Sequence, residues 1–248
     1  HLQSPALHVS AVDGGAALNL WGRIVILDAH DRVVTELSSE WWWLVAFYGA
    51  DRSAIAASAP VVDSALVLAN DTPSINFAHV LLDQVALAAA VGGRADGLRA
   101  NTLTQVVGPT TQRWHAPVLD AHLRPLGGPI MALGWFTGVR ADRLWIPGSP
   151  SLVPHPAYKG ASWARDFLRR AVPPGAPTDT PRRIYLNRKG FRRQVANIDV
   201  DVLQRLDLTP ITLDELPYAD QARLLRQADL VVADHGAGLA HVVQMQPG

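Results

Sequence analysis

The chain has 248 residues, equal numbers of acidic and basic side chains (22 each) and 48% hydrophobic residues, so it is long enough to bury a real core and does not have the composition of a disordered tail. It contains no cysteine, which excludes disulfides, thiolate metal sites and a cysteine nucleophile. No apolar run approaches the roughly 18 residues that a membrane-spanning helix needs, because Asp83 and Gln84 interrupt the most apolar stretch.

The amino-terminal part alternates between strand-like and helical patterns. Periodicity predicts a helix over His79–Val91, preceded by strands and followed by further short strands. The predicted strands are Arg23–Leu27 and Val33–Leu37 about a turn at residues 29–31, then Ala65–Leu68, Leu103–Val107, Ile130–Leu133 and Leu144–Ile146. We therefore expect an α/β domain over residues 1–155.

Two proline-rich segments, residues 147–156 and 173–181, indicate a boundary between this domain and a second one over residues 156–248. Between them, Ser162–Ala171 has helical spacing. We expect that helix to place Arg165, Arg169 and Arg170 on its solvated side.

The last third of the chain shows strands and helices in strict alternation. The expected order is strand Arg182–Leu186, helix Asn197–Leu206, strand Thr209–Leu213, helix Ala219–Ala228 and strand Leu230–Asp234. This order is typical of a parallel, doubly wound sheet, which binds its ligand at the carboxyl ends of the strands.

Two segments at those ends have the chemistry of a phosphate site. The basic loop 187–193 follows the first strand and supplies Arg188, Lys189 and Arg193, while 13 of the 22 basic residues fall between Lys159 and Arg226. The glycine-rich turn after the last strand opens with His235, and the backbone of Gly236, Ala237 and Gly238 can approach an anion closely. The alternatives are a solvated basic turn and a buried, hydrogen-bonded histidine.

Glu215 follows the middle strand, where an acidic residue commonly contacts the ribose or base of a nucleotide. The alternative is that it helps to cap the next helix, for which Asp214 is the better candidate.

The sequence resembles glycosyltransferase family 61, often described in bacteria as capsular polysaccharide biosynthesis proteins. The resemblance rests on residues 184–189, 192–193, 214–216, 219–221 and 228–239, on Pro247-Gly248 and, upstream, on the Asn76–Asp83 segment. It implies a GT-B-like architecture of two Rossmann-like domains facing a crevice, the second one incomplete here. It also implies inverting transfer of a sugar from a nucleotide-sugar donor.

Inverting transfer needs a base for the acceptor hydroxyl. The candidates are His79 and Asp83, which are four residues apart and share one helical face, with Asn76 as a nearby substrate-binding residue. Alternatively, Asn76 caps the helix and the pair supports a domain interface.

We expect no cofactor and no metal, because Asp199 and Asp201 fall inside a predicted helix, and His241 with Asp234 lacks a third ligand at suitable spacing. Expected partners are a nucleotide sugar and a glycan or lipid-linked glycan acceptor. We expect no nucleic acid, because few aromatic residues lie among the arginines.

The 20 arginines against two lysines suggest a GC-rich bacterial genome. They are the basis for expecting a cytoplasmic enzyme with at most peripheral association at the inner face of the membrane. The alternative function is a non-catalytic nucleotide- or glycan-binding module, in which the tryptophans at 41–43 stack on sugar.

Overall fold

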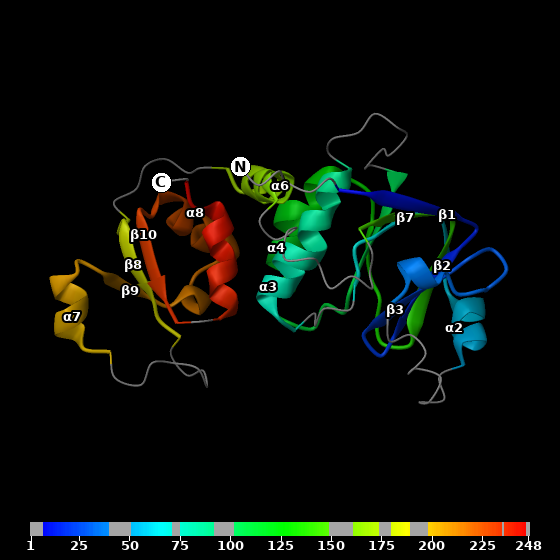
Figure 1. Cartoon of the computed structure of the whole chain (residues 1–248), viewed down its shortest axis with the longest axis horizontal. Helices are drawn as coiled ribbons and strands as arrows, with labels where there is room; N and C mark the ends of the chain where they lie inside the picture. Colours follow the sequence, from blue (N-terminus) through cyan, green and yellow to red (C-terminus); the bar gives the residue numbers. More distant parts are fainter. Residues whose placement is uncertain are drawn as a thin grey trace. The chain divides into compact units, whose positions relative to one another are not determined.

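The computed structural model describes residues 7–39, 51–70, 75–91, 102–148, 161–173, 180–188, 198–234 and 236–246 (Figure 1). The chain divides into two compact units, His1–Phe167 and Leu168–Gly248. The predicted boundary at 155/156 lies outside the described residues and stays a prediction. Each unit is described by itself below.

The amino-terminal unit is built on one mixed sheet. Its strands are β1 (Val9–Asp13), β2 (Ala16–Leu20), β3 (Arg23–Leu27), β4 (Val61–Val67), β5 (Thr104–Val107), β6 (Ile130–Ala132) and β7 (Thr137–Pro147). The order is β3-β2-β7-β4-β5-β6, with β1 also paired to β7. The expectation of a Rossmann-like sheet holds only for β7-β4-β5-β6, which are parallel, because β1 and β2 run antiparallel to β7.

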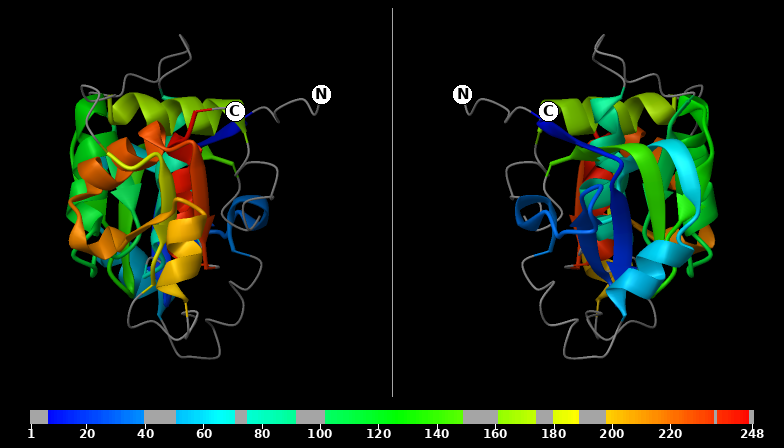
Figure 2. Two further views of the ribbon diagram at one scale, coloured as in Figure 1. Left: turned by 90° about the vertical axis from the view of Figure 1, so that its left-hand side faces the viewer. Right: turned by 90° about the vertical axis from the view of Figure 1, so that its right-hand side faces the viewer.

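Strands β2 and β3 are buried on both sides, which is why the alternation of polar and apolar residues is weak there. Ala17 and Ile26 pack in one core cluster, whereas Leu18 and Leu27 pack in a second cluster with Ala56. The right-hand view of Figure 2 looks onto this unit, with these strands in dark blue. Burial on both sides replaces the period of two with a continuous apolar run.

The predicted strand Val33–Leu37 is wrong. Val33 forms a single bridge to Leu27, and residues 35–37 form a 3-10 helix, η1 (Thr35–Leu37). The hydroxyl of Ser38 accepts a hydrogen bond from the Ile26 amide at 2.9 Å. The Ser38 hydroxyl therefore accepts the hydrogen bond from Ile26 that a carbonyl of a neighbouring strand would otherwise accept.

The predicted helix His79–Val91 is helical but not one α-helix. It consists of α3 (Phe77–His79), the π-helical η2 (Val80–Gln84) and the 3-10 helix η3 (Val85–Ala90). The other helices of this unit are α2 (Arg52–Ser58), α4 (His115–His122) and η5 (Arg124–Leu126). The helix α6 (Ser162–Ala171), which crosses the boundary between the units, has the predicted bounds. None of the helices in the described residues is both long and apolar enough to span a bilayer.

The carboxyl-terminal unit confirms the predicted alternation of strands and helices. It consists of β8 (Arg183–Leu186), α7 (Val200–Arg205), β9 (Thr209–Ile211), η6 (Leu213–Glu215), α8 (Tyr218–Gln227), β10 (Leu230–Ala233) and η7 (Ala237–Gln244). The three strands are parallel in the order β10-β8-β9. The first helix begins three residues later than predicted, because Asp199 caps it by accepting from the Asp201 amide at 2.8 Å.

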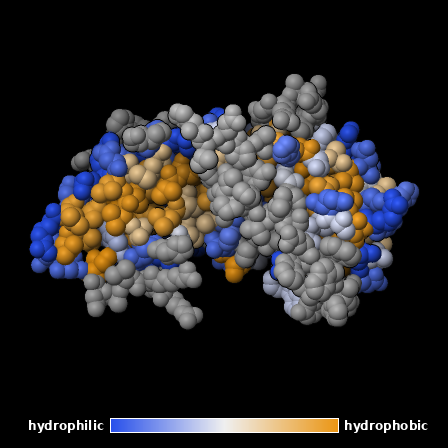
Figure 3. All heavy atoms as spheres, viewed as in Figure 1, coloured by the Kyte–Doolittle hydropathy of each residue, from blue (hydrophilic) through white to orange (hydrophobic). Residues whose placement is uncertain are grey.

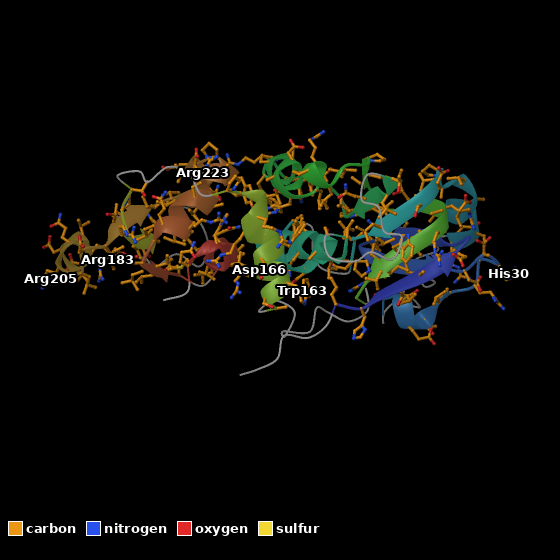
Figure 4. All side chains as sticks on the ribbon, turned by 90° about the horizontal axis from the view of Figure 1, so that it is seen from above. His30, Trp163, Asp166, Arg183, Arg205 and Arg223 are labelled. Carbon is orange, nitrogen blue, oxygen red and sulfur yellow. The ribbon has the colours of Figure 1, made fainter. Side chains whose placement is uncertain are left out.

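The small sheet has a helix on each face. Ile184 and Leu186 pack with Leu225 of α8, whereas Tyr185 packs with Leu203 of α7. Arg183, labelled in Figure 4, donates to the Leu206 carbonyl just after α7. Figure 3 shows apolar side chains over the region of β10 and η7. This unit is therefore a short doubly wound α/β sheet, as the sequence predicts.

Candidate active site

The order of strands in the carboxyl-terminal unit identifies where a ligand fits. The chain forms β8 first, adds β9 on one side and then places β10 on the other side. The direction of sheet growth therefore reverses between β8 and β10. In open α/β sheets, ligands bind outside the carboxyl ends of the strands at such a switch point.

Arg188 and Gly236 meet at this point. Arg188 follows β8 and Gly236 follows β10, and the two parallel strands pair Leu186 with Ala233 at their carboxyl ends. A Cβ atom on Gly236 would lie 2.6 Å from both Cζ and Nη1 of Arg188. The guanidinium therefore packs directly against the glycine, in space that only a residue without a side chain leaves open.

Tyr185 and Asp234 link the same two strands. The Tyr185 hydroxyl donates to Oδ1 of Asp234 at 3.1 Å. Burial, together with the hydrogen bond and the negative charge of Asp234, raises the pKa of Tyr185, so the phenol stays protonated and continues to donate. This contact fixes the residue that precedes the glycine-rich turn.

The glycine-rich turn continues into η7, whose first residues are Ala237 and Gly238. A Cβ atom on Gly238 would be 3.4 Å from the Leu213 side chain, an ordinary contact, so Gly238 is less confined than Gly236. Backbone N–H groups at the start of a helix are the groups that bind phosphate in many sites. Lys189, Arg193 and His235 lie outside the described residues.

The far end of η7 is held by two arginines. Arg169 of α6 donates to the carbonyls of Gln244 and Met245, and Arg226 of α8 donates to the Arg169 carbonyl and to the Gln244 side chain. The expectation that Arg169 faces solvent is therefore wrong: helix-terminal carbonyls supply it with hydrogen-bond acceptors. Burial and the neighbouring Arg169 charge lower the pKa of Arg226. Sequence patterns gave no signal for this network, because its members are far apart in the chain.

Glu215 and Asp214 are exposed in η6, just after β9. The capping alternative is wrong, because α8 begins at Tyr218 with Pro217 at its N-cap and no side-chain cap. Glu215 lies just after β9, a strand that neighbours β8, and its role near a nucleotide stays a prediction.

His79 and Asp83 form a hydrogen-bonded pair in the amino-terminal unit. Nδ1 of His79 lies 2.6 Å from Oδ2 of Asp83; the histidine side chain is 31% exposed, whereas the aspartate side chain is fully buried. With its proton on Nδ1, the imidazole donates to the carboxylate and keeps its Nε2 lone pair for accepting a proton. The pair therefore has the arrangement of an oriented general base.

The helix around this pair is irregular. The π-helical turn η2 includes Asp83, and the Asn70 side chain donates to the Asp83 carbonyl at 2.6 Å. Single π-helical turns are frequent at functional sites. Asn76 caps α3 by accepting from the Ala78 amide at 3.0 Å, which is the capping role considered as its alternative.

The described residues contain no group of three or more metal-ligating side chains. Asp199 is a helix cap, Asp201 lies in the first turn of the same helix, and His241 is buried with its ring 5.8 Å from that of Tyr218. Asp199 therefore lies at the N-cap of α7 and not, as the sequence had predicted, inside the helix.

Two comparisons with known proteins bear on the family of the chain. The sequence profile of the family Glycosyltransferase 61 matches residues 72–248. The EGF domain-specific O-linked N-acetylglucosamine transferase of Drosophila melanogaster is 30% identical to the chain over 80 residues. That alignment covers 30% of the chain and 15% of the relative's length.

Proposed function

Because the chain belongs to the glycosyltransferase 61 family, we propose that it transfers a sugar from a nucleotide-sugar donor to a glycan acceptor with inversion at the anomeric carbon. The observation that carries the proposal is the contact between the Arg188 guanidinium and Gly236 at the switch point of the carboxyl-terminal sheet. A planar guanidinium beside a glycine, whose backbone no side chain covers, is suited to binding a diphosphate.

The donor diphosphate binds Arg188 and the backbone N–H groups at the start of η7. Lys189, Arg193 and His235 add charge and hydrogen bonds to the same anion, and Glu215 contacts the ribose or base. Neutralising the leaving diphosphate is the main task of catalysis here, because negative charge develops on it as the bond to the sugar breaks. Fixed donors need no reorganisation when that charge appears.

His79 is the base of the proposed reaction. Its Nε2 takes the proton of the acceptor hydroxyl while the hydroxyl oxygen attacks the anomeric carbon. The bond from that carbon to the diphosphate oxygen breaks as the new glycosidic bond forms, so a single displacement inverts the configuration. Asp83 stabilises the imidazolium that results, and Asn76 supports this segment as the cap of α3.

The proposed acceptor is a glycan or lipid-linked glycan of a capsular or extracellular polysaccharide, extended by an enzyme in the cytoplasm at the inner face of the membrane. A second acceptor class follows from the Drosophila protein, whose name describes transfer of N-acetylglucosamine to EGF domains. In that case the attacking oxygen belongs to a protein hydroxyl and the donor carries N-acetylglucosamine.

The test is a calorimetric or thermal-shift titration with nucleoside diphosphates and their sugar conjugates, UDP-N-acetylglucosamine among them, with and without divalent metal. We expect one nucleotide to stabilise the protein and Arg188→Ala to abolish the effect. Arg182→Ala is the matched control, because it removes the same charge from the amino end of β8, where Arg182 pairs with Asp229 on the surface.

Failure of every nucleotide to bind the folded protein would contradict the proposal. Nucleotide binding without sugar transfer to any glycan or EGF-domain acceptor would favour the non-catalytic alternative, a nucleotide- or glycan-binding module.

A further inference from the structure

Three exposed aromatic side chains lie on two turns at one end of the main sheet. Trp21 is 50% exposed, Trp135 62% and Phe136 43%. The Trp21 and Phe136 rings are 6.2 Å apart between centroids and tilted by 39°. We call these three residues the aromatic platform.

The first turn holds Trp21 at a positive φ, a conformation that asparagine, aspartate and glycine adopt more readily. Leu20 pairs with Arg23, so Trp21 and Gly22 form a two-residue hairpin turn, with φ values of 58° and 81°. Such turns need positive φ at both positions and are usually made of Asn-Gly, Asp-Gly or Gly-Gly. A tryptophan at the first position costs backbone energy that asparagine would not.

The second turn also holds an aromatic residue at positive φ. Phe136 has a φ of 58° just before β7, and Thr137 closes the turn by donating its hydroxyl proton to the Gly134 carbonyl at 2.8 Å. Both strained positions of the platform thus carry large aromatic rings. Neither ring is required by the backbone, and neither is buried in the core.

One buried residue, Asn19, braces both turns. It is 1% exposed, its side chain donates to the Leu133 carbonyl at 3.0 Å and accepts from the Gly22 amide at 2.8 Å, and its carbonyl accepts from the Phe136 amide at 2.8 Å. The aromatic rings are therefore presented on a rigid support. Rigid presentation lowers the entropy that a binding surface loses when it takes up a ligand.

We propose that the aromatic platform is a carbohydrate-binding site for β-linked chains of gluco- or xylo-configured sugars. In these pyranoses all hydroxyls are equatorial, so both ring faces carry only axial C–H bonds. Those bonds stack on the electron-rich face of an aromatic ring. Two exposed rings whose centroids are 6.2 Å apart are close enough to contact neighbouring parts of one chain.

The surroundings favour this ligand over a membrane or an apolar protein surface. Within residues 19–23 and 133–137, Arg23 is the only charged side chain, whereas surfaces that bind anionic lipid combine apolar rings with several cations. The exposed large hydrophobic residues of these two turns are all aromatic, with no aliphatic side chain among them. Flat rings with no exposed aliphatic side chain in the same turns suit the face of a sugar.

The test uses two variants that remove a ring and relieve the backbone. Trp21→Asn and Phe136→Asn place an asparagine at positive φ, and Trp135→Ser removes the third ring. The control is Val61→Thr, which alters an exposed β-branched residue elsewhere on the same sheet. Binding of cellohexaose, xylohexaose, chitohexaose and mannohexaose is followed by the indole N–H signals in NMR titrations, without any nucleotide.

We expect cello-, xylo- or chitohexaose to bind better than mannohexaose, whose axial hydroxyl interrupts one face. Each aromatic variant should weaken binding about tenfold or more, and Val61→Thr should not change it. The melting temperature of the two asparagine variants should be unchanged or higher, which a packing role for the rings would not allow.

Three results would each overturn the inference: no binding of any oligosaccharide at millimolar concentration, binding that survives loss of all three rings, or a lower melting temperature in both asparagine variants. Loss of binding to phosphatidylglycerol vesicles in the aromatic variants, without oligosaccharide binding by the wild type, would point to a membrane surface and also overturn it. Because no donor is present, the outcome is independent of the proposed transfer reaction.

Discussion

A methyl group added at Gly236 should disable the proposed donor site through Arg188 without unfolding the protein. The new Cβ would lie 2.6 Å from Cζ and Nη1 and 2.8 Å from Nε of Arg188. Carbon atoms in contact are normally about 3.5 to 4.0 Å apart, so the guanidinium must move by about 1 Å. It is the far end of a flexible side chain, and Gly236 is extended with φ of 174°, so alanine fits the backbone.

The cost should therefore fall on binding and not on folding. A charge-assisted hydrogen bond contributes about 1.5 to 3 kcal/mol, which corresponds to about 10- to 150-fold in affinity. Calorimetry with the nucleoside diphosphate that the wild type binds should show a loss of this size for Gly236→Ala. The free energy of unfolding should change by less than about 1 kcal/mol.

A double-mutant cycle tests the route of the effect. If Gly236→Ala acts by displacing the guanidinium, it should add little to the loss already caused by Arg188→Ala. If Gly236→Ala lowers the nucleotide affinity equally with and without Arg188, the reasoning is refuted. The backbone of Gly236 would then bind the phosphate directly.

Further changes have equally definite outcomes. His79→Gln should lower kcat by about 10²- to 10⁴-fold with the donor dissociation constant unchanged, and Asp83→Asn should shift the pH profile of kcat/KM, both measured in transfer assays. Tyr185→Phe should cost about 1 kcal/mol in urea unfolding, because it removes the hydrogen bond from Tyr185 to Asp234. Transfer should persist in EDTA, since in the proposed site side-chain cations and backbone N–H groups neutralise the diphosphate. Burial lowers the pKa of His122 to about 4, so the unfolded state binds the extra proton first and stability should fall by up to about 3 kcal/mol between pH 6.5 and pH 4. His122→Leu should flatten that part of the curve.

The carboxyl-terminal unit could be predicted from sequence because its strands are short, apolar and separated by clear helix and turn signals. Predicted and observed bounds of β8 and β10 differ by one residue at one end. The strand order could not be predicted, because helical connections allow β10 to join either side of β8. The switch point, and with it the pairing of Arg188 with Gly236, required the structure.

The amino-terminal unit was harder to predict because its signals are weak. β2 is buried on both faces, so its residues show no alternation, and α4 contains two histidines and a proline in eight residues. Neither element was predicted. The mixed sheet likewise depends on β1 and β2 pairing antiparallel with the much later β7, a contact without a local signal.

Two asparagines show why site residues are harder to predict than elements. Asn76 is a candidate for binding substrate because its spacing from His79 and Asp83 resembles that of the family, and the structure shows its side-chain oxygen accepting a backbone hydrogen bond as a helix cap. Asn19 had no such spacing, yet it connects two turns that are more than a hundred residues apart in sequence. An asparagine side chain has both a donor and an acceptor, so it can bind a ligand or cap a backbone group. The residue type alone therefore does not predict which partner the side chain has. That partner is decided by which backbone groups the fold leaves unpaired nearby. In the aromatic platform, Asn19 pairs with the backbone groups of both turns. The side chains of Trp21 and Phe136 are therefore not needed to hold the turns, and both are exposed.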